Sequence, residues 1–393
     1  MKILIVCQFF YPEIFSINDV AKGLVKKGHE VLVVTGKPNY GYGRILDGYE
    51  SVNDEMIDGV RVHRCPLRPR KKGRLSIIAN YLSFWFHSRR YLKRLKEEFD
   101  VVYSMSLSPL ISIVGGTIYA RKHHVRHVLH CLDLWPEATV VTGAVRRHSL
   151  LYRVLFGWCK KIYANLDAIL ISSPSFKRYF HETLGVKNVP ISYVPQPPQV
   201  SLPTREITYD HKFNFVYAGN IGTLQLVEEA VLATELVQDK IDVCLHILGM
   251  GARADAVCRL IEEHGLSKRV KYYGIRPREE VASYYQNATG IIVSLSHKGI
   301  VGDTIPNKLN SSLAYGKPIL GVIQGDGARV LEEAEGAVLS HGETPNDIAL
   351  AMLRLAQMDE KTRQKLGDNN AAYFKAHYEL DGILDEIVNH LKK

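Results

Sequence analysis

The stretch Asp303-Thr-Ile-Pro-Asn-Lys-Leu-Asn-Ser-Ser-Leu-Ala-Tyr-Gly-Lys-Pro-Ile-Leu320 decides how this chain is interpreted. Its polar start predicts a loop, Leu309 and Leu313 predict a short helix, and Gly316-Lys317-Pro318 ends that helix before a buried strand. A helix start offers unpaired N–H groups and partial positive charge, and Lys308 adds a cation there. The stretch therefore predicts either a phosphate-binding loop and helix or an ordinary strand–helix–strand crossover.

Strands and helices alternate in both halves of the chain. The first half opens with a strand at 3–6, an amphipathic helix at 17–25 and a strand at 30–35. The proline-rich segment 194–203 cannot be regular structure, and a strand at 213–217 then restarts the pattern. We therefore predict an α/β protein with two Rossmann-like domains facing each other across a cleft. The first half lacks G-x-G-x-x-G, which disfavours a dinucleotide-dependent dehydrogenase.

Composition limits the class of protein. The 393 residues, 46% of them hydrophobic, are enough for two domains with their own cores. No C-x-x-C pair occurs among the six cysteines, which argues against a zinc site or a disulfide framework and favours a reducing cytoplasm. No window of about 18 apolar residues occurs, so we predict no signal peptide and no membrane span.

The formal net charge of +9 is unevenly distributed. Residues 61–96 contain 12 Lys or Arg and no Asp or Glu, and the aromatic and aliphatic segment 77–86 lies between the basic clusters. This pattern predicts binding to an anionic membrane surface. The alternatives are a core helix with a solvated basic end, or nucleic-acid binding, for which no recognition motif is present. The candidate membrane residues are Arg70, Lys71, Lys72, Trp85, Arg89 and Arg90.

A second informative element follows the predicted strand 126–131. The chain continues there as Leu132-Asp133-Leu134-Trp135-Pro136-Glu137. A carboxylate just past the carboxyl end of a strand lies where open α/β sheets place their ligands. Asp133 is therefore predicted either to contact a ligand or to cap the following turn.

The stretch 303–320 resembles the donor-binding segment of retaining glycosyltransferases of family 4, enzymes with the two-domain GT-B fold. Many members carry two glutamates eight positions apart here, and Asp303 and Ser311 stand at these positions. The second glutamate usually holds the nucleotide ribose, so Ser311 departs from the pattern. The segment 133–137 resembles a signature of the branch that builds bacterial surface polysaccharides, including transferases of N-acetyl-L-fucosamine.

The resemblance implies a domain organisation. It gives an N-terminal acceptor-binding Rossmann-like domain at 1–194, a proline-rich linker at 195–204 and a C-terminal nucleotide-sugar-binding Rossmann-like domain at 205–375. A C-terminal helix at 376–393 is expected to pack back on the first domain.

The resemblance also implies site residues. The candidate catalytic residues are Asp133, Asp303 and Lys308, and the acceptor-side candidates are Tyr40, Trp135 and Glu137. Asn220 and Gln225 stand near the place of the family's basic pair, so the diphosphate is expected to rely on backbone N–H groups and Lys308. The donor-binding candidates are Ser16, Asn18, Gly219, Asn220, Gly222, Gln225, Gly249, Arg276, Thr304, Ile305, Pro306, Asn307 and Ser311.

The resemblance implies a retaining glycosyltransferase. Because the chain contains no Asp-x-Asp, we predict a metal-independent enzyme that needs no cofactor beyond its UDP-sugar substrate. The expected reaction moves an N-acetylated amino-deoxyhexose to a polyprenyl-diphosphate-linked saccharide in O-antigen or capsule assembly. The expected location is the cytoplasmic face of the membrane, as a peripheral protein with no nucleic-acid partner. The alternatives are a UDP-sugar 2-epimerase of the same fold and a non-catalytic nucleotide-sugar-binding protein.

Overall fold

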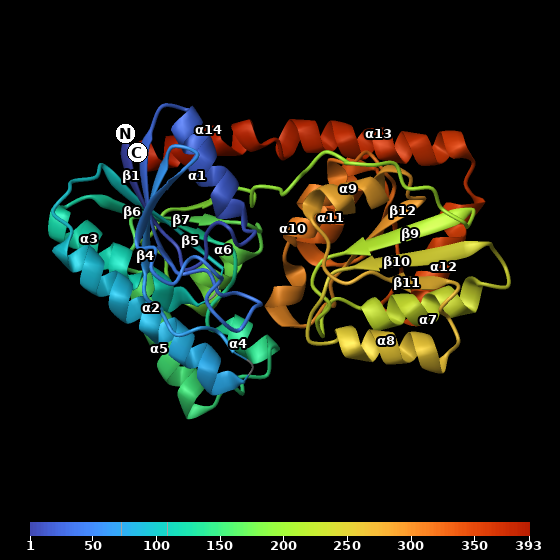
Figure 1. Ribbon diagram of the computed structural model, residues 1–393, viewed down its shortest axis with the longest axis horizontal. Helices are drawn as coiled ribbons and strands as arrows, with labels where there is room; N and C mark the ends of the chain where they lie inside the picture. The colour runs from blue at the N-terminus through green and yellow to red at the C-terminus, as the bar shows by residue number, and fades with distance from the viewer. Residues whose placement is uncertain (72, 108) are drawn as a thin grey trace. The chain divides into compact units, whose positions relative to one another are not determined.

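The computed structural model describes residues 1–71, 73–107 and 109–393 (Figure 1). The chain divides into two compact units. The first comprises Met1–Pro197 and Leu380–Lys393, and the second comprises Pro198–Glu379. Each unit is a largely parallel sheet with helices on both faces. The two-domain α/β architecture predicted from the sequence is confirmed.

The sheet of the first unit has the order β3-β4-β2-β1-β5-β6-β7-β8. Only the β3–β4 pair is antiparallel among the described strands. The strand order reverses between β1 and β5, which makes the carboxyl ends of these strands a switch point, where open α/β sheets bind ligands. The strands are β1 (Lys2–Val6), β2 (Glu30–Gly36), β3 (Asp54–Ile57), β4 (Val60–Cys65), β5 (Val101–Ser106), β6 (Arg126–Cys131), β7 (Ala168–Ile171) and β8 (Ile191–Tyr193).

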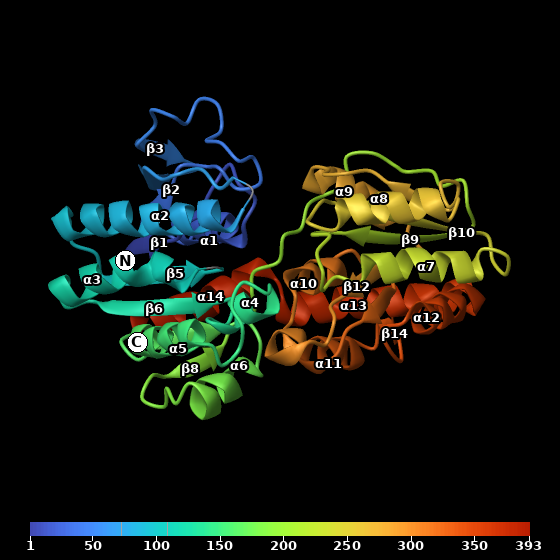
Figure 2. The ribbon, with the colours of Figure 1, turned by 90° about the horizontal axis from the view of Figure 1, so that it is seen from below.

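Successive side chains of β1 point to opposite faces of this sheet, and different helices cover the two faces. Ile3 and Ile5 lie in a core with α1 and α14, whereas Leu4 and Val6 lie in a core with α2 and α3. Helices α2 and α3 run side by side on their face (Figure 2). The helices are α1 (Ser16–Lys26), α2 (Arg74–Arg94), η1 (Leu110–Ile113), α3 (Val114–His123), α4 (Glu137–Val141), α5 (Leu150–Tyr163), α6 (Phe176–Arg178), η2 (Tyr179–Thr183) and α14 (Leu380–Lys392).

The sheet of the second unit has the order β11-β10-β9-β12-β13-β14, and its described pairings are parallel. Its order reverses between β9 and β12, so the loops after these strands form its switch point. The strands are β9 (Phe213–Ala218), β10 (Val243–Leu248), β11 (Val270–Tyr272), β12 (Gly290–Ser294), β13 (Ile319–Val322) and β14 (Ala337–Leu339).

Two groups of helices cover this second sheet. Tyr217 and Ile247 pack in the core with α7, α8 and α12, whereas Val216 and Leu248 pack in the core with α9, α10 and α11. The helices are α7 (Val227–Val237), α8 (Ala254–Glu263), α9 (Arg278–Gln286), η3 (Gly299–Asp303), α10 (Asn307–Leu313), α11 (Gly325–Ala334), α12 (Pro345–Gln357) and α13 (Glu360–His377).

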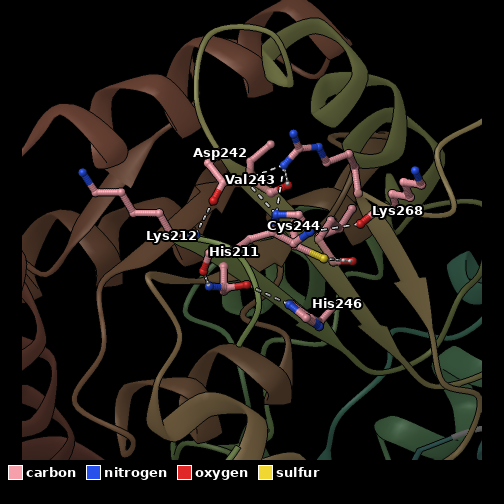
Figure 3. A network of polar contacts seen from close by, with 10 residues as sticks. His211, Lys212, Asp242, Val243, Cys244, His246 and Lys268 are labelled. Atoms are coloured by element: carbon pink, nitrogen blue, oxygen red, sulfur yellow. Dashed lines mark hydrogen bonds and ion pairs between the residues drawn. The ribbon is translucent and has the colours of Figure 1, made fainter. Parts of the chain in front are cut away.

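A polar cluster joins the amino ends of β9, β10 and β11 (Figure 3). The Oδ1 atom of Asp242 lies 2.6 Å from Arg269 Nη1 and 2.8 Å from His211 Nδ1. Its Oδ2 atom accepts a hydrogen bond from the backbone N–H of Lys212 at 2.9 Å. These contacts, with that of His211 first, hold the pKa of the Asp242 carboxyl well below its usual range.

Replacing Asp242 with asparagine is expected to lower the free energy of unfolding at pH 7 by about 1 kcal/mol, since the cluster is partly exposed to solvent. The folded-state pKa is depressed, so this stabilisation is present above the unfolded carboxyl pKa of about 4 and is lost as pH falls further. Denaturant unfolding should therefore show a smaller difference at pH 3 than at pH 7. The exposed neighbour Asp210, changed to asparagine, is the control, and an equal difference at both pH values would contradict the linkage.

Candidate functional site

Two glycine loops, which follow β9 and β10, pack backbone against backbone, and the first of them lies at the switch point of the second unit. The N–H of Gly219 donates to Leu248 O at 2.9 Å, and the N–H of Ile221 donates to Met250 O at 2.9 Å. A β-carbon on Gly249 would lie 1.9 Å from the Gly219 carbonyl oxygen, which no larger residue tolerates. The loop after β9 is therefore held rigidly at the position where an α/β sheet binds a ligand.

Lys308 lies against this loop through Tyr217. The Lys308 Nζ donates to the Tyr217 hydroxyl at 3.0 Å and lies 4.3 Å from the centroid of that ring. The hydroxyl in turn donates to the carbonyl oxygen of Asn220 at 2.5 Å. Burial lowers the pKa of Lys308 to about 7. The structure thus brings together two of the predicted donor-binding elements, the glycine loop and the lysine, although they are far apart in sequence.

Asn220 and Gln225, near the place of the family's basic pair, contact each other. The Nδ2 of Asn220 donates to Oε1 of Gln225 at 3.2 Å. A β-carbon on Gly222 would lie 2.6 Å from that same oxygen, so the glycine gives the two amides room to meet. The pair supplies neutral hydrogen-bonding groups beside the loop, and the positive charge comes from Lys308.

Asp303 ends η3 and lies beside a histidine that the sequence analysis missed. The Nδ1 of His297 is 3.5 Å from Oδ1 of Asp303. Glu343 fixes the turn that carries this histidine, accepting from the backbone N–H of His297 at 2.5 Å and from Ser296 Oγ at 2.7 Å. The position of His297 just beyond a buried strand could have indicated it, whereas nothing local in the sequence indicates Glu343.

The other predicted donor-binding residues of this unit differ in burial and in their hydrogen-bond partners. The hydroxyl of Ser311 accepts from the backbone N–H of Gln199 at 2.8 Å, so it already serves to anchor the linker. The side chain of Ile305 is buried in the core, which leaves only its backbone for a ligand. Asn307 begins α10 with a buried Oδ1 that has no hydrogen-bond partner in the described part of the chain. The Nε atom of Arg276 lies 3.6 Å from Oε1 of Glu280. Thr304 and Pro306 lie in the loop before α10.

In the first unit, Asp133 follows β6 at the carboxyl edge of the sheet. Its carboxylate has no hydrogen bond or ion pair with any residue that the structure describes, so the predicted capping alternative is not what the contacts show. Burial raises the pKa of this carboxyl to about 7. The Asp133 charge also contributes to raising the pKa of Tyr81, after burial and Tyr40, which places the two side chains near each other. A carboxyl group with a pKa near 7 at the carboxyl edge of a sheet is suited to accepting or donating a proton at neutral pH.

The acceptor-side candidates differ in accessibility. Tyr40 is 43% exposed and packs edge-on against Phe9, with 5.0 Å between ring centroids. The Trp135 backbone N–H donates to the Tyr163 hydroxyl at 3.3 Å. Glu137 is only 3% exposed and accepts hydrogen bonds from two tyrosine hydroxyls at 2.6 and 3.1 Å. Its carboxylate therefore forms hydrogen bonds in the interior of the unit and does not face solvent.

The remaining predicted residues of the first unit lie in two places. Ser16 Oγ accepts from Gln196 Nε2 at 3.2 Å, and Asn18 Nδ2 donates to a backbone carbonyl in the preceding loop. The membrane candidates Lys71, Arg89 and Arg90 are exposed, and the Arg89 guanidinium lies 5.7 Å from the centroid of the partly buried Trp85 ring. Lys72 lies outside the described residues.

The described part of the chain contains neither a candidate metal cluster nor a candidate membrane-spanning helix. No cluster of three or more His, Cys, Asp or Glu side chains suitable for a metal ion occurs in 1–71, 73–107 and 109–393. No helix within the same ranges is long and apolar enough to cross a membrane.

Solved structures with this arrangement define the class of fold. The chain aligns over its full length with 98% of sucrose-phosphate synthase from Thermosynechococcus elongatus, with a TM-score of 0.77 and 17% identity. It also aligns in full with 99% of Anabaena HepE, solved in complex with UDP and glucose, with a TM-score of 0.69 and 14% identity. The fold is GT-B, as predicted.

Both halves of the chain match glycosyltransferase domain families. Residues 16–197 match the model described as "Glycosyl transferase 4-like domain", and residues 204–373 match "Glycosyl transferases group 1". The chain therefore consists of a glycosyl transferase 4-like domain followed by a glycosyl transferases group 1 domain.

Two curated relatives carry related names. "Probable glycosyltransferase WbjE" of Pseudomonas aeruginosa is 27% identical over 274 residues, which is 65% of this chain and 65% of that protein. "Putative colanic acid biosynthesis glycosyl transferase WcaI" of Escherichia coli K12 is 22% identical over 80% of this chain and 82% of that protein. The match thus spans about two thirds of the length of the first relative.

Proposed function

We propose that this protein is a retaining, metal-independent glycosyltransferase that moves a sugar from a UDP-sugar to a polyprenyl-diphosphate-linked saccharide in surface-polysaccharide assembly. The observation that carries the proposal is Lys308, seated on Tyr217 against the glycine loop of a glycosyl transferases group 1 domain. The name of WcaI refers to colanic acid biosynthesis, and HepE has been solved with UDP-glucose, which supports this substrate class.

The second unit has the groups to stabilise a departing nucleoside diphosphate. Cleavage of the sugar–phosphate bond leaves negative charge on the diphosphate and an oxocarbenium-like carbon on the sugar, so cations and oriented N–H groups lower the barrier. Lys308 supplies the charge, and the further hydrogen bonds are assigned to backbone N–H groups of the loop after β9 other than those of Gly219 and Ile221, which already donate within the protein. Lys308 then does what a carboxylate-bound metal ion does in other transferases.

The first unit has the group to receive an acceptor hydroxyl. The Asp133 carboxylate is available for a hydrogen bond because no described residue occupies it. In front-face attack the leaving phosphate takes the acceptor proton, and an ionised Asp133 orients the hydroxyl. The resemblance of 133–137 to transferases of N-acetyl-L-fucosamine supports an N-acetylated amino-deoxyhexose as the transferred sugar.

An exposed apolar stripe on α2 supports a location at the membrane surface. Its residues recur at helical spacing, so they share one face of the helix, and Arg89 and Arg90 lie exposed near its end. Cations beside an apolar helical face suit an anionic bilayer. We propose a peripheral protein on the cytoplasmic face of the membrane. The stripe, called the α2 stripe below, consists of Leu75, Ile78, Leu82 and Phe86.

Reversing the charge of Arg89 and Arg90 to glutamate is expected to weaken binding to phosphatidylglycerol vesicles at least about tenfold in a flotation assay. The reason is that each cation near such a surface contributes roughly 1 kcal/mol. Lys361 and Lys365, exposed on α13 and changed to glutamate, give the same change in net charge and should bind as wild type does. Equal loss in both pairs would mean that net charge, and not this surface, drives binding.

A donor panel in the presence of EDTA tests the proposed reaction. Several UDP-sugars are incubated with and without a polyprenyl-diphosphate disaccharide, and products are read by mass spectrometry. An acceptor product one sugar heavier supports metal-independent transfer and identifies the donor. An acceptor-independent isomer of the UDP-sugar would indicate the 2-epimerase, and binding without turnover would indicate a nucleotide-sugar-binding protein. The anomeric configuration of the product tests retention.

A further inference from the structure

Arg70 has surroundings unlike those of the other arginines near the start of α2. Its guanidinium carbon lies 5.0 Å from the Tyr40 ring centroid and 5.6 Å from the Tyr81 ring centroid. The charge of Arg70 also partly offsets the rise that burial causes in the pKa of the Tyr81 hydroxyl. Two rings that hold one guanidinium fix its position without neutralising its charge.

Arg70 has no carboxylate partner within residues 1–71, 73–107 and 109–393. Two arginines of β4 in the same unit do have one, because Arg61 pairs with Glu97 at 2.7 Å and Arg64 pairs with Glu55. Arg70 thus keeps an uncompensated charge although it is half-buried. A planar guanidinium held in this way is suited to a bidentate contact with phosphate oxygens.

The backbone that carries Arg70 is anchored by a buried network of amides. The N–H of Arg70 donates to Oδ1 of Asn39 at 2.9 Å, and Asn80 Nδ2 donates to the same oxygen at 3.1 Å. Asn80 Nδ2 also donates to Arg68 O at 2.6 Å, and Asn80 Oδ1 accepts from Gln8 Nε2 at 2.8 Å. Asn39 and Asn80 are fully buried. Because this network already holds the backbone of Arg70 in place, binding a ligand there costs little free energy for reorganising the protein.

Arg70 is linked through Tyr81 to Asp133 and is close in sequence to the start of α2. Tyr81, which binds its guanidinium, also lies within electrostatic range of Asp133. Shortly after Arg70 in the sequence, α2 begins at Arg74, and Leu75 at the start of the α2 stripe is 84% exposed. A saccharide linked through a diphosphate to a lipid has these three parts in the same order: hydroxyl, phosphate and hydrocarbon.

We propose that Arg70 binds a phosphate of the lipid-linked acceptor, with the saccharide directed towards Asp133 and the hydrocarbon chain along the α2 stripe. This inference rests on the proposed function, whose acceptor class it explains through a specific residue. It separates Arg70 from Arg89 and Arg90, which contact the membrane surface through charge alone. The guanidinium is a binding group, and Tyr40 and Tyr81 are its positioning residues.

Calorimetry with a short-chain polyprenyl diphosphate in neutral detergent micelles tests the inference. Arg70→Gln is expected to weaken this binding at least tenfold and to leave UDP affinity unchanged, since UDP binds the second unit. Arg68→Gln removes the same charge from an exposed side chain two residues away and should stay within twofold of wild type. Tyr81→Phe keeps the ring and removes the hydroxyl, so an intermediate loss is expected.

Three results would overturn the assignment of Arg70. Equal losses in Arg68→Gln and Arg70→Gln would mean general electrostatics. An Arg70→Gln variant that binds the diphosphate as well as wild type does would remove Arg70 from the site. A matching loss of binding to phosphatidylglycerol vesicles would assign the residue to bilayer headgroups. A wild-type protein that binds no UDP would instead contradict the proposed function, so the two failures are distinguishable.

Discussion

Replacing Lys308 with methionine is expected to weaken UDP-sugar binding about 10- to 100-fold, the effect of losing one charge-assisted hydrogen bond to the diphosphate. Methionine keeps an unbranched apolar stem over the Tyr217 ring, so the core around β9 should not open. Calorimetry with UDP and with the UDP-sugar measures the loss. Lys298→Ala removes an exposed lysine of the same unit and should leave affinity unchanged.

The same lysine should make donor binding depend on pH. Its folded-state pKa of about 7 leaves roughly half of the free protein without the ammonium charge at neutral pH. The diphosphate favours the charged form, so binding takes up a proton and the dissociation constant rises several-fold per pH unit above pH 7. The Lys308→Met variant should lose this dependence. A wild-type affinity that is flat from pH 6 to pH 9 would show that Lys308 does not contact the diphosphate.

Tyr217→Phe separates the charge of Lys308 from its position. This variant retains the ring under the ammonium group but removes the hydroxyl that links Lys308 to the Asn220 carbonyl. A loss of affinity smaller than in Lys308→Met is expected, with the pH dependence retained. A tyrosine on β9 thus acts as the support of a lysine on α10.

Local sequence patterns were sufficient for the fold and for single elements of the site. The glycine turn after 213–217 and the lysine at the start of the predicted helix both follow from strand and helix signals that span only a few residues. Their contact does not, because β9 and α10 meet only through the order of strands in the sheet. Pairings over such separations are set by tertiary packing, which a single sequence does not display.

Burial gives two predicted site residues surroundings that the sequence does not indicate. Glu137 follows Trp135 and Pro136 in a ligand-like motif, yet its carboxylate faces two tyrosine hydroxyls from α5 and η2. Arg70 sits in a run of cations and was grouped with the membrane residues, yet two rings and an amide network hold it. In both cases the partners come from other elements, so charge and spacing along the chain carry no sign of them.

Replacing Asp133 with asparagine is expected to lower kcat about 100-fold or more while UDP-sugar affinity is retained. Asparagine has the same shape but cannot orient the acceptor hydroxyl as a carboxylate does. Since the carboxyl pKa is raised to about 7, wild-type kcat at saturating UDP-sugar, where the bound diphosphate keeps Lys308 charged, should rise between pH 6 and pH 8 as the carboxylate ionises. That rise should be absent from the variant, and Asp58→Asn, at an exposed ion pair with Lys22, should retain it.

Stability distinguishes this role of Asp133 from a structural one. A raised carboxyl pKa means that the folded state binds the proton more tightly than the unfolded state, so ionisation of Asp133 destabilises the fold above pH 4. Asp133→Asn should therefore unfold at an equal or higher denaturant concentration than wild type at pH 8. A capping carboxylate would give the opposite result, because its removal costs a hydrogen bond. If Asp133→Asn is inactive but at least as stable as wild type, the Asp133 carboxylate does not stabilise the fold. Its charge is then kept in an unfavourable environment because the reaction requires it.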